Sequence, residues 1–374
     1  MTIQEELGDI SGWRVTKVVR NPWGQVPHTG GGRYLSDAAR AYMDRLLAQQ
    51  RVPDTESRRH HYVPQAYLRQ WSFDGRRVWT LDTVTGLVKP LGTRDVCVNE
   101  NFYRVIGPDG APHNRVEKLF GVVDTELGRV QRLFADLEDP ETLDFDDLLG
   151  LGITMAVQRM RTLQQRRIQI QHSAWMAAQS PKFQLIADDD QNPHQAAGIH
   201  TELLFKAMWK AADVLIKRQI EVWDDPKARF MTCDAPVLIP FVRNERPGTQ
   251  DAEYVIWPVS PQRVVALSRN HVGEKVVIRE ATGQLVGVVR DAVEQGRERM
   301  IFASEAQRDR LPARKLFRRR TQVRLRCSDR GPLGNYVAPP GCVVKMSETF
   351  ADKPDVALCD QGLHSPAPEM LKFV

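Results

Sequence analysis

The chain has 374 residues, of which 42% are hydrophobic and 26% charged, an ordinary balance for a globular protein with a sizeable core. No apolar run approaches the roughly 18 residues of a membrane span, and the first residues have no apolar stretch of a secretory signal. The five cysteines are odd in number and never in Cys-x-x-Cys spacing, which argues against a disulfide framework and a structural zinc site. We therefore expect a cytoplasmic protein with no membrane partner.

The net charge of +5 comes from one basic segment. Residues 297–330 contain 12 Lys and Arg against 4 Asp and Glu, which leaves about −3 for the rest of the chain. This segment, with Arg318, Arg319 and Arg320 at its centre, predicts binding of nucleic acid or another polyanion. A solvated basic surface is the alternative.

Residues 1–57 are expected to form an N-terminal extension that includes a short helix over 37–50, capped by Ser36. Short strands then follow, at 76–83, 85–91 and 100–106. Three helices are predicted next, at 114–137, 144–178 and 195–220. The pair Asn114 and Glu117 has the spacing of a helix cap, which gives Glu117 a structural explanation.

Strands return in the second half, at 229–233, 252–259, 263–268 and 274–281, followed by a helix over 287–302. The order of strands, helices and strands predicts an α+β fold, a central helical bundle flanked by short, mainly antiparallel strands. We divide the chain into the extension at 1–57, a core domain at 58–304, and a basic segment with an irregular tail at 305–374.

Two adjacent histidines, His60 and His61, stand in the stretch SRRHHYVPQAYLRQW. Successive side chains of a strand point to opposite faces, so one imidazole can face a site while the other faces away. One of them could act as a base or a metal ligand in a nuclease. Alternatively, one imidazole bonds to the backbone while Tyr62, Tyr67 and Trp71 pack in the core.

Further candidates lie on the helices and at one turn. Glu126 borders an apolar helix face, where a carboxylate needs a partner or a metal ion. Gln158 and Arg161 lie on a polar stripe, where Arg161 could bind a phosphate or pair with Glu126. Asp234 precedes Ala-Pro in a fixed turn that presents its carboxylate or uses it as a cap.

The segments HHYVPQAYLRQW, NFY, VEKLFGVVDTEL, QRMR, FMTCDAPV and WPVSP resemble, in this order, the bacterial family catalogued as domain of unknown function 4238. The resemblance covers about residues 58–304 and implies that His60, His61, Gln158, Arg161 and Asp234 come together in space. Cys233 and Ala235 depart from it, since the family has Ser and Asn at these positions.

Three hypotheses for the function follow. The first is a metal-dependent nuclease or phosphodiesterase that uses His60, His61, Gln158, Arg161 and Asp234, with Glu126 as a ligand of a divalent metal and Arg318, Arg319 and Arg320 on the substrate. The second is a non-catalytic binding or regulatory module of a bacterial defence or stress system. The third is an enzyme acting on a small ligand that carries a phosphate or carboxylate.

Overall fold

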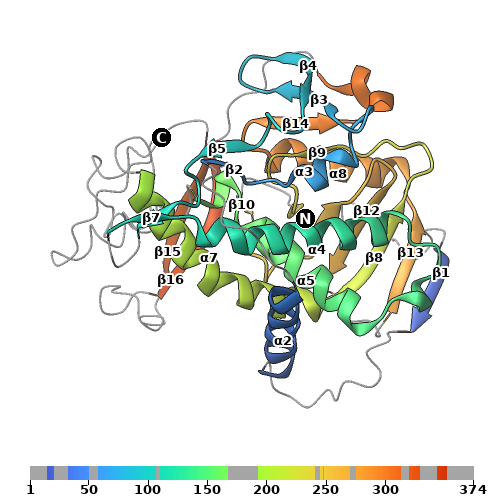
Figure 1. The fold of residues 1–374 in the computed structure, drawn as a ribbon. Helices are drawn as coiled ribbons and strands as arrows, with labels where there is room; N and C mark the ends of the chain where they lie inside the picture. The colour runs from blue at the N-terminus through green and yellow to red at the C-terminus, as the bar shows by residue number, and fades with distance from the viewer. Residues whose placement is uncertain are drawn as a thin grey trace.

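The structure is a computed structural model, which describes residues 15–20, 33–49, 58–106, 110–166, 193–240, 245–246, 248–269, 275–312, 320–328 and 343–351. Helices and mainly antiparallel strands both contribute large parts of the core, so the fold is α+β as predicted (Figure 1). In this part of the chain, no helix is long and apolar enough to cross a membrane.

The largest sheet has five strands, which lie in the order β1-β13-β8-β12-β11. These strands are β1 (Val15–Arg20), β13 (Lys275–Glu280), β8 (Gln219–Asp224), β12 (Arg263–Ser268) and β11 (Tyr254–Pro258). Only β13 and β8 run parallel among these neighbours. The strand β1 comes from the predicted N-terminal extension, so that segment contributes an edge to the main sheet.

Four helices pack against one another beside this sheet, and α4 also contacts β12 (Figure 1). They are α2 (Arg33–Gln49), α4 (Arg115–Ala135), α5 (Phe145–Met160) and α7 (Pro193–Ile216). A capping box stabilises the start of α5: the side chain of Asp144 accepts the backbone N–H of Asp147, and the side chain of Asp147 accepts the backbone N–H of Asp144. An unbroken run from Leu148 to Arg159 is then buried, so α5 is the central helix of the group.

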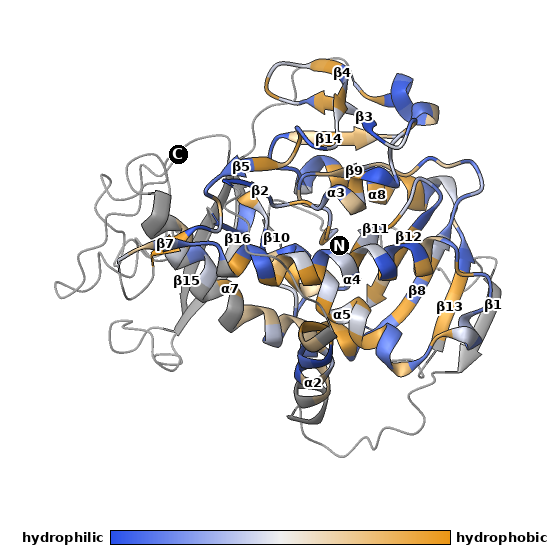
Figure 2. Ribbon diagram, in the orientation of Figure 1, coloured by the Kyte–Doolittle hydropathy of each residue, from blue (hydrophilic) through white to orange (hydrophobic). Residues whose placement is uncertain are grey.

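A smaller four-stranded sheet lies at the top of Figure 1, in the order β4-β3-β14-β9. Its strands are β4 (Leu87–Gly92), β3 (Arg77–Asp82), β14 (Met300–Ala303) and β9 (Thr232–Cys233). The helix α8 (Gly283–Gly296) and the 3₁₀ helix at Glu305–Arg310 flank it. Figure 2 shows apolar residues concentrated along the strands of the main sheet and along α5.

The remaining elements are short. Strand β2 (Arg59–His61) pairs with β5 (Val98–Glu100), and β6 (Val105–Ile106) pairs with β7 (Pro112–His113). A third sheet orders β10 (Glu245–Arg246), β16 (Val343–Ala351) and β15 (Arg320–Ser328). The 3₁₀ helix Pro140–Thr142 joins α4 to α5.

The short helix α3 (Gln65–Arg69) fastens the histidine stretch to the core. The hydroxyl of Tyr67 lies 2.6 Å from both the Thr232 hydroxyl and the carbonyl oxygen of Pro258, to which it donates. The amide of Gln131 donates to the carbonyl oxygens of Tyr67 and Val259. Tyr67 and Trp71 are fully buried, which confirms that they are packing residues.

Several predicted boundaries were wrong. The helix predicted over 287–302 ends at Gly296, and Met300–Ala303 forms β14 instead. The strand predicted over 100–106 is broken at Asn101, whose φ of 54° is in the left-handed region that Asn tolerates. Helix α2 begins before Ser36, which therefore lies inside it. Helix α5 ends at Met160, and residues 167–178 lie outside the described part of the chain.

Candidate functional site

The strand β2 turns its two histidines to opposite faces, as the alternation of a strand requires. His60 is fully buried, and its Nδ1 accepts the backbone N–H of Tyr103 at 2.9 Å. The imidazole also stacks on the Tyr103 ring, with the ring centroids 5.9 Å apart. His60 therefore holds the turn that follows β5.

His61 lies on the other face and is partly exposed. Burial lowers its pKa below the ordinary 6.5, and the charges of Arg161 and Arg59 lower it further, against a hydrogen bond with the Arg94 backbone that raises it. Nε2 of His61 is buried and has no hydrogen-bond partner among the described residues. A neutral imidazole has one ring nitrogen that can accept a proton.

Gln158 and Arg161 lie at the end of α5, both fully buried. The Gln158 amide donates to the carbonyl oxygen of Tyr62 at 3.1 Å, and its Oε1 accepts Nε of Arg161 at 3.0 Å. The hydroxyl of Tyr103 donates to the Arg161 carbonyl at 2.9 Å. His60 is thus joined to Arg161 through Tyr103, and Arg161 is joined to Gln158 by a direct hydrogen bond.

The Arg161 guanidinium pairs with Asp124 of α4, not with Glu126. Its Nη1 donates to Asp124 Oδ1 at 2.6 Å, and the group lies 5.3 Å from the centre of the Phe120 ring. Burial alone would lower the pKa of Arg161, but Asp124 raises it, so the group stays charged. The Nη2 of Arg161 is buried and has no hydrogen-bond partner among the described residues.

Glu117 completes this group, although the sequence favoured a capping role for it. Asn114 is the N-cap of α4 but makes no side-chain capping bond. Glu117 Oε2 is buried and unpartnered among the described residues. Burial and the charge of Asp124 raise the pKa of Glu117 to about 7, against the opposing effect of Arg161. At neutral pH, this carboxyl can therefore both give and take a proton.

Asp234 has a different environment. It is buried, and its two oxygens accept the backbone N–H groups of Glu298, Arg299 and Met300 at 2.8–3.0 Å. Burial raises the pKa of Asp234 to about 6, against those hydrogen bonds. The carboxylate thus fixes the start of β14. Its charge acts on Tyr62 of the histidine stretch.

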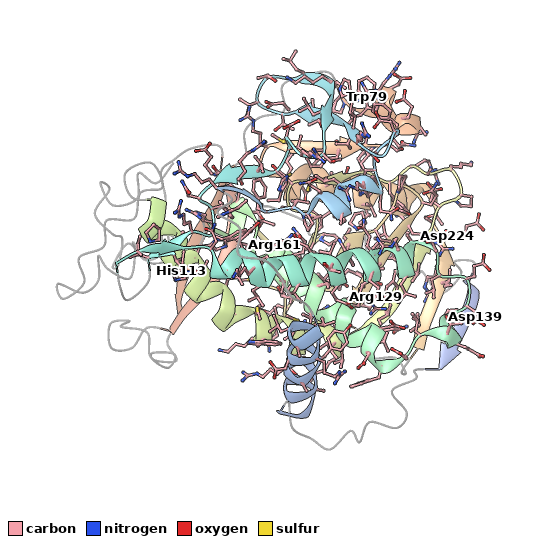
Figure 3. All side chains as sticks on the ribbon, in the orientation of Figure 1. Trp79, His113, Arg129, Asp139, Arg161 and Asp224 are labelled. Atoms are coloured by element: carbon pink, nitrogen blue, oxygen red, sulfur yellow. The ribbon has the colours of Figure 1, made fainter. Side chains whose placement is uncertain are left out.

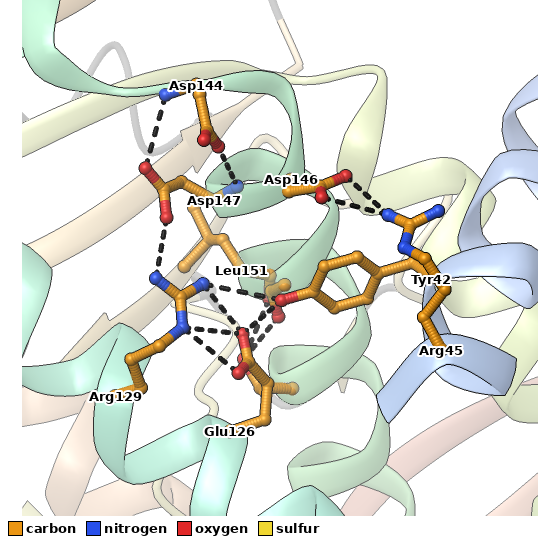
Figure 4. A network of polar contacts seen from close by, with 10 residues as sticks. Tyr42, Arg45, Glu126, Arg129, Asp144, Asp146, Asp147 and Leu151 are labelled. Carbon is orange, nitrogen blue, oxygen red and sulfur yellow. Dashed lines mark hydrogen bonds and ion pairs between the residues drawn. The ribbon is translucent and has the colours of Figure 1, made fainter. Parts of the chain in front are cut away.

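Glu126 lies nine residues from Glu117 along α4, about 13 Å on the helix axis. Its oxygens accept the hydroxyl of Tyr42 at 2.5 Å and the guanidinium of Arg129 at 2.8–3.2 Å (Figure 4). Figure 3 shows Arg129 and Arg161 at separate positions in the molecule. All four oxygens of Glu126 and Asp234 therefore have protein donors. Among the described residues, no three His, Cys, Asp or Glu side chains form a group that could hold a metal ion.

Of the basic residues predicted to bind substrate, Arg318 and Arg319 lie outside the described part of the chain. Arg320 begins β15, and its role stays a prediction.

We define the Arg161 cluster as His61, Glu117, Asp124 and Arg161. Sequence reasoning found His61 and Arg161 but missed the two acids of α4. Glu117, Phe120 and Asp124 are spaced i, i+3 and i+7, which places them on one helix face, and this spacing was the available signal. The cluster holds an imidazole, a carboxyl that titrates near pH 7 and a buried cation. It can therefore accept a proton, donate a proton and bind a negative charge.

Comparison with known proteins agrees with the sequence resemblance. No curated protein and no solved structure matches the chain. A family model described as protein of unknown function (DUF4238) matches residues 59–304, more than half of the chain, including every member of the Arg161 cluster. The chain therefore belongs to the DUF4238 family.

Proposed function

We propose that the protein is a phosphodiesterase of the nuclease type whose reaction takes place at the Arg161 cluster. The observation that carries this proposal is the carboxyl of Glu117: its Oε2 is buried and has no hydrogen-bond partner among the described residues, and burial and the charge of Asp124 raise its pKa to about 7, against the opposing effect of Arg161. A carboxyl that only stabilised the fold would be ionised and hydrogen-bonded. A strongly raised pKa beside a specific charge is typical of a proton-transfer group.

Each member of the cluster has a role in such a reaction. The Nη2 of Arg161 donates to a non-bridging phosphate oxygen and stabilises the charge that develops on it. The Nε2 of His61 takes a proton from the attacking water as a new P–O bond forms. Glu117 gives its proton to the leaving oxygen as the other P–O bond breaks.

Asp124 and the buried network support these groups. Asp124 keeps Arg161 charged and, with 30% of its side chain exposed, marks the side on which the cluster approaches solvent. Gln158 orients the Arg161 guanidinium through Nε, which leaves Nη2 for the ligand. These steps use only side chains of the Arg161 cluster; Glu126 and Asp234, whose oxygens accept hydrogen bonds from the protein, take no part in them.

The second candidate is a non-catalytic binding module. It is favoured by the full burial of His60, Gln158 and Arg161, which together form a network with the backbone at residues 62 and 103. Such a module would bind an anionic group at the Arg161 cluster without turnover.

An activity assay separates these candidates. DNA, RNA and bis(4-nitrophenyl) phosphate would be incubated with the full chain in Mg²⁺, Mn²⁺ or EDTA. We expect turnover that falls roughly 10²-fold or more in His61→Ala and in Glu117→Gln. The matched control is Glu141→Gln, which removes the charge of an exposed carboxylate. No turnover of any substrate, or an unchanged rate in both cluster variants, would overturn the proposal.

A further inference from the structure

The charges of the Arg161 cluster depend on one proton. Arg161 and Asp124 form an ion pair and cancel each other. The lowered pKa of His61 leaves its imidazole neutral at pH 7. The cluster therefore carries no net charge when Glu117 is protonated and one negative charge when Glu117 is ionised.

The same proton decides which hydrogen bonds the cluster can offer. The Nη2 of Arg161 is a donor in either state. Ionised Glu117 has only acceptor oxygens. It cannot form a hydrogen bond with the oxygens of an anion, which are acceptors as well. Protonated Glu117 becomes a second donor, so the two unpartnered groups can then bind one oxyanion together.

No other described group compensates for the ionised carboxylate. The groups that act on Glu117 are Asp124 from its own helix and Arg161 from the end of α5. The charge of Glu117 also acts on Tyr103, but burial raises the pKa of Tyr103 well above its ordinary value, so this hydroxyl stays neutral. Burial likewise lowers the pKa of His200 in α7 to about 3, so this ring is uncharged as well. Arg166 acts on Tyr103 and His200, and its guanidinium is held by the carbonyl oxygen and ring of Phe102.

We propose that the Arg161 cluster binds a singly charged oxyanion group, and that each anion bound well above neutral pH brings one proton onto Glu117. This inference deepens the proposed function and rests on it, because a phosphodiester is such a group. A carboxylate shares this chemistry. A doubly charged phosphate monoester would bring two negative charges to a buried cluster that has no net charge of its own, so its binding is disfavoured relative to that of a singly charged group.

Isothermal titration calorimetry of the full chain tests the proposal. The probes are diethyl phosphate and acetate, which distinguish the two sources of a singly charged oxyanion, and sulfate, which is doubly charged. Titrations at pH 6 and pH 8.5, each in two buffers of different ionisation enthalpy, measure the protons taken up on binding. We expect uptake of about one proton at pH 8.5 and little at pH 6, with affinity falling about tenfold per pH unit above pH 7. Sulfate should bind more weakly than diethyl phosphate.

The variant Glu117→Gln provides the decisive comparison, because its amide keeps a donor and carries no charge. We expect it to bind diethyl phosphate at pH 8.5 more tightly than the wild type, about as tightly as the wild type binds at pH 6, and without proton uptake. The control Glu141→Gln should behave as the wild type. No binding at pH 6, no proton uptake at pH 8.5, or binding by Glu117→Gln no tighter than by the wild type at pH 8.5 would overturn the inference.

The two proposals can fail separately. If turnover depends on Glu117 but binding takes up no proton, the phosphodiesterase proposal stands and this inference is wrong. If diethyl phosphate binds with proton uptake but no diester is hydrolysed, the enzyme proposal is wrong and the protein is an anion-binding module.

Discussion

The backbone N–H of Tyr103 donates to Nδ1 of His60 at 2.9 Å. This bond fixes the proton of a neutral His60 on Nε2 and leaves Nδ1 unavailable for substrate. The Tyr103 hydroxyl in turn donates to the carbonyl oxygen of Arg161 at 2.9 Å. One histidine of the pair thus positions the end of α5, and the adjacent histidine faces the Arg161 cluster.

The first prediction separates these two histidines. His60→Ala should lower the free energy of unfolding by about 2–4 kcal/mol, because it leaves a cavity and a buried N–H without its acceptor. His61→Ala, at a partly exposed position, should change it by less than about 1 kcal/mol and still lower turnover roughly 10²-fold or more. Urea denaturation of both variants measures the difference. Equal losses of stability would contradict the assignment.

The second prediction concerns the pH dependence of turnover. Glu117 must be protonated to act as an acid, so the rate should fall as pH rises above about 7. His61 must be neutral to act as a base, so the rate should fall as pH drops through its lowered pKa, below 6.5. The profile of kcat/KM should therefore be a narrow bell on the acid side of neutrality. Activity that rises steadily to pH 9 would rule out this pair of roles.

The third prediction is that Glu117→Gln stabilises the protein at alkaline pH. The folded pKa is about 7 and the ordinary value is 4.5, so between these values the folded state keeps a proton that the unfolded state has lost. Stability therefore falls as pH rises from 4.5 to 7, by up to about 3 kcal/mol in total. The variant should be more stable than the wild type by up to that amount at pH 8 and similar near pH 4.5. Urea midpoints at the two pH values test this, with Glu141→Gln as the unaffected control.

Glu117 also shows where sequence reasoning reached its limit. The spacing of Asn114 and Glu117 correctly predicted where α4 begins, because local sequence determines a helix start. It could not show that the capping bond is absent or that Arg161, 44 positions later, meets the same helix face. Such contacts depend on how α4 and α5 pack. The outcome for His60 and His61 was easier to predict, since strand alternation alone sends them to opposite faces.

The fourth prediction concerns Asp234, whose catalytic role stays a prediction of the sequence. Asp234→Asn replaces one acceptor oxygen with a donor that faces a backbone N–H, so stability at pH 8 should fall by about 1–3 kcal/mol. Burial raises the pKa of the wild-type Asp234 carboxyl to about 6, so below pH 6 this carboxyl takes up a proton and also loses an acceptor. The difference in stability between the variant and the wild type should therefore be smaller below pH 6. Denaturation at pH 5 and pH 8 measures both effects. A lost reaction rate with unchanged stability would instead support catalysis by Asp234.

The same carboxylate explains an error in the predicted fold. The apolar spacing over 287–302 suits one helix, yet β14 begins at Met300. The N–H groups of Glu298, Arg299 and Met300 point at Asp234 rather than at carbonyls one turn earlier. This partner lies 64–66 positions away, and no local pattern reveals it. The strands β3, β11 and β12 were predicted well because short runs rich in apolar and β-branched residues, bounded by turns, define them locally.

The last prediction concerns Glu126, which fits closely against α5. A Cβ on Gly150 would lie 2.6 Å from Glu126 Oε1, which is closer than a Cβ atom comes to a neighbouring atom in real proteins. Figure 4 shows the contacts of Glu126. Gly150→Ala should therefore destabilise the protein, and so should Glu126→Ala, which leaves the hydroxyl of Tyr42 without its acceptor. In the double variant the contact with Glu126 Oε1 is gone, while the contacts with Val130 Cγ2 at 3.1 Å and the Tyr42 hydroxyl at 3.2 Å remain, so the combined loss should be smaller than the sum by about 1 kcal/mol.

Gly152→Ala is the matched control for this cycle, because its Cβ would meet Ile216 and not Glu126. Its loss of stability should add to that of Glu126→Ala within about 0.5 kcal/mol. Thermal or urea unfolding of the five variants gives both coupling energies. If Gly150→Ala and Glu126→Ala were simply additive, the carboxylate would not be the group that requires glycine there. A folded Glu126→Ala that lost turnover, and regained it with excess Mg²⁺ or Mn²⁺, would instead restore the metal-ligand role that the sequence suggested.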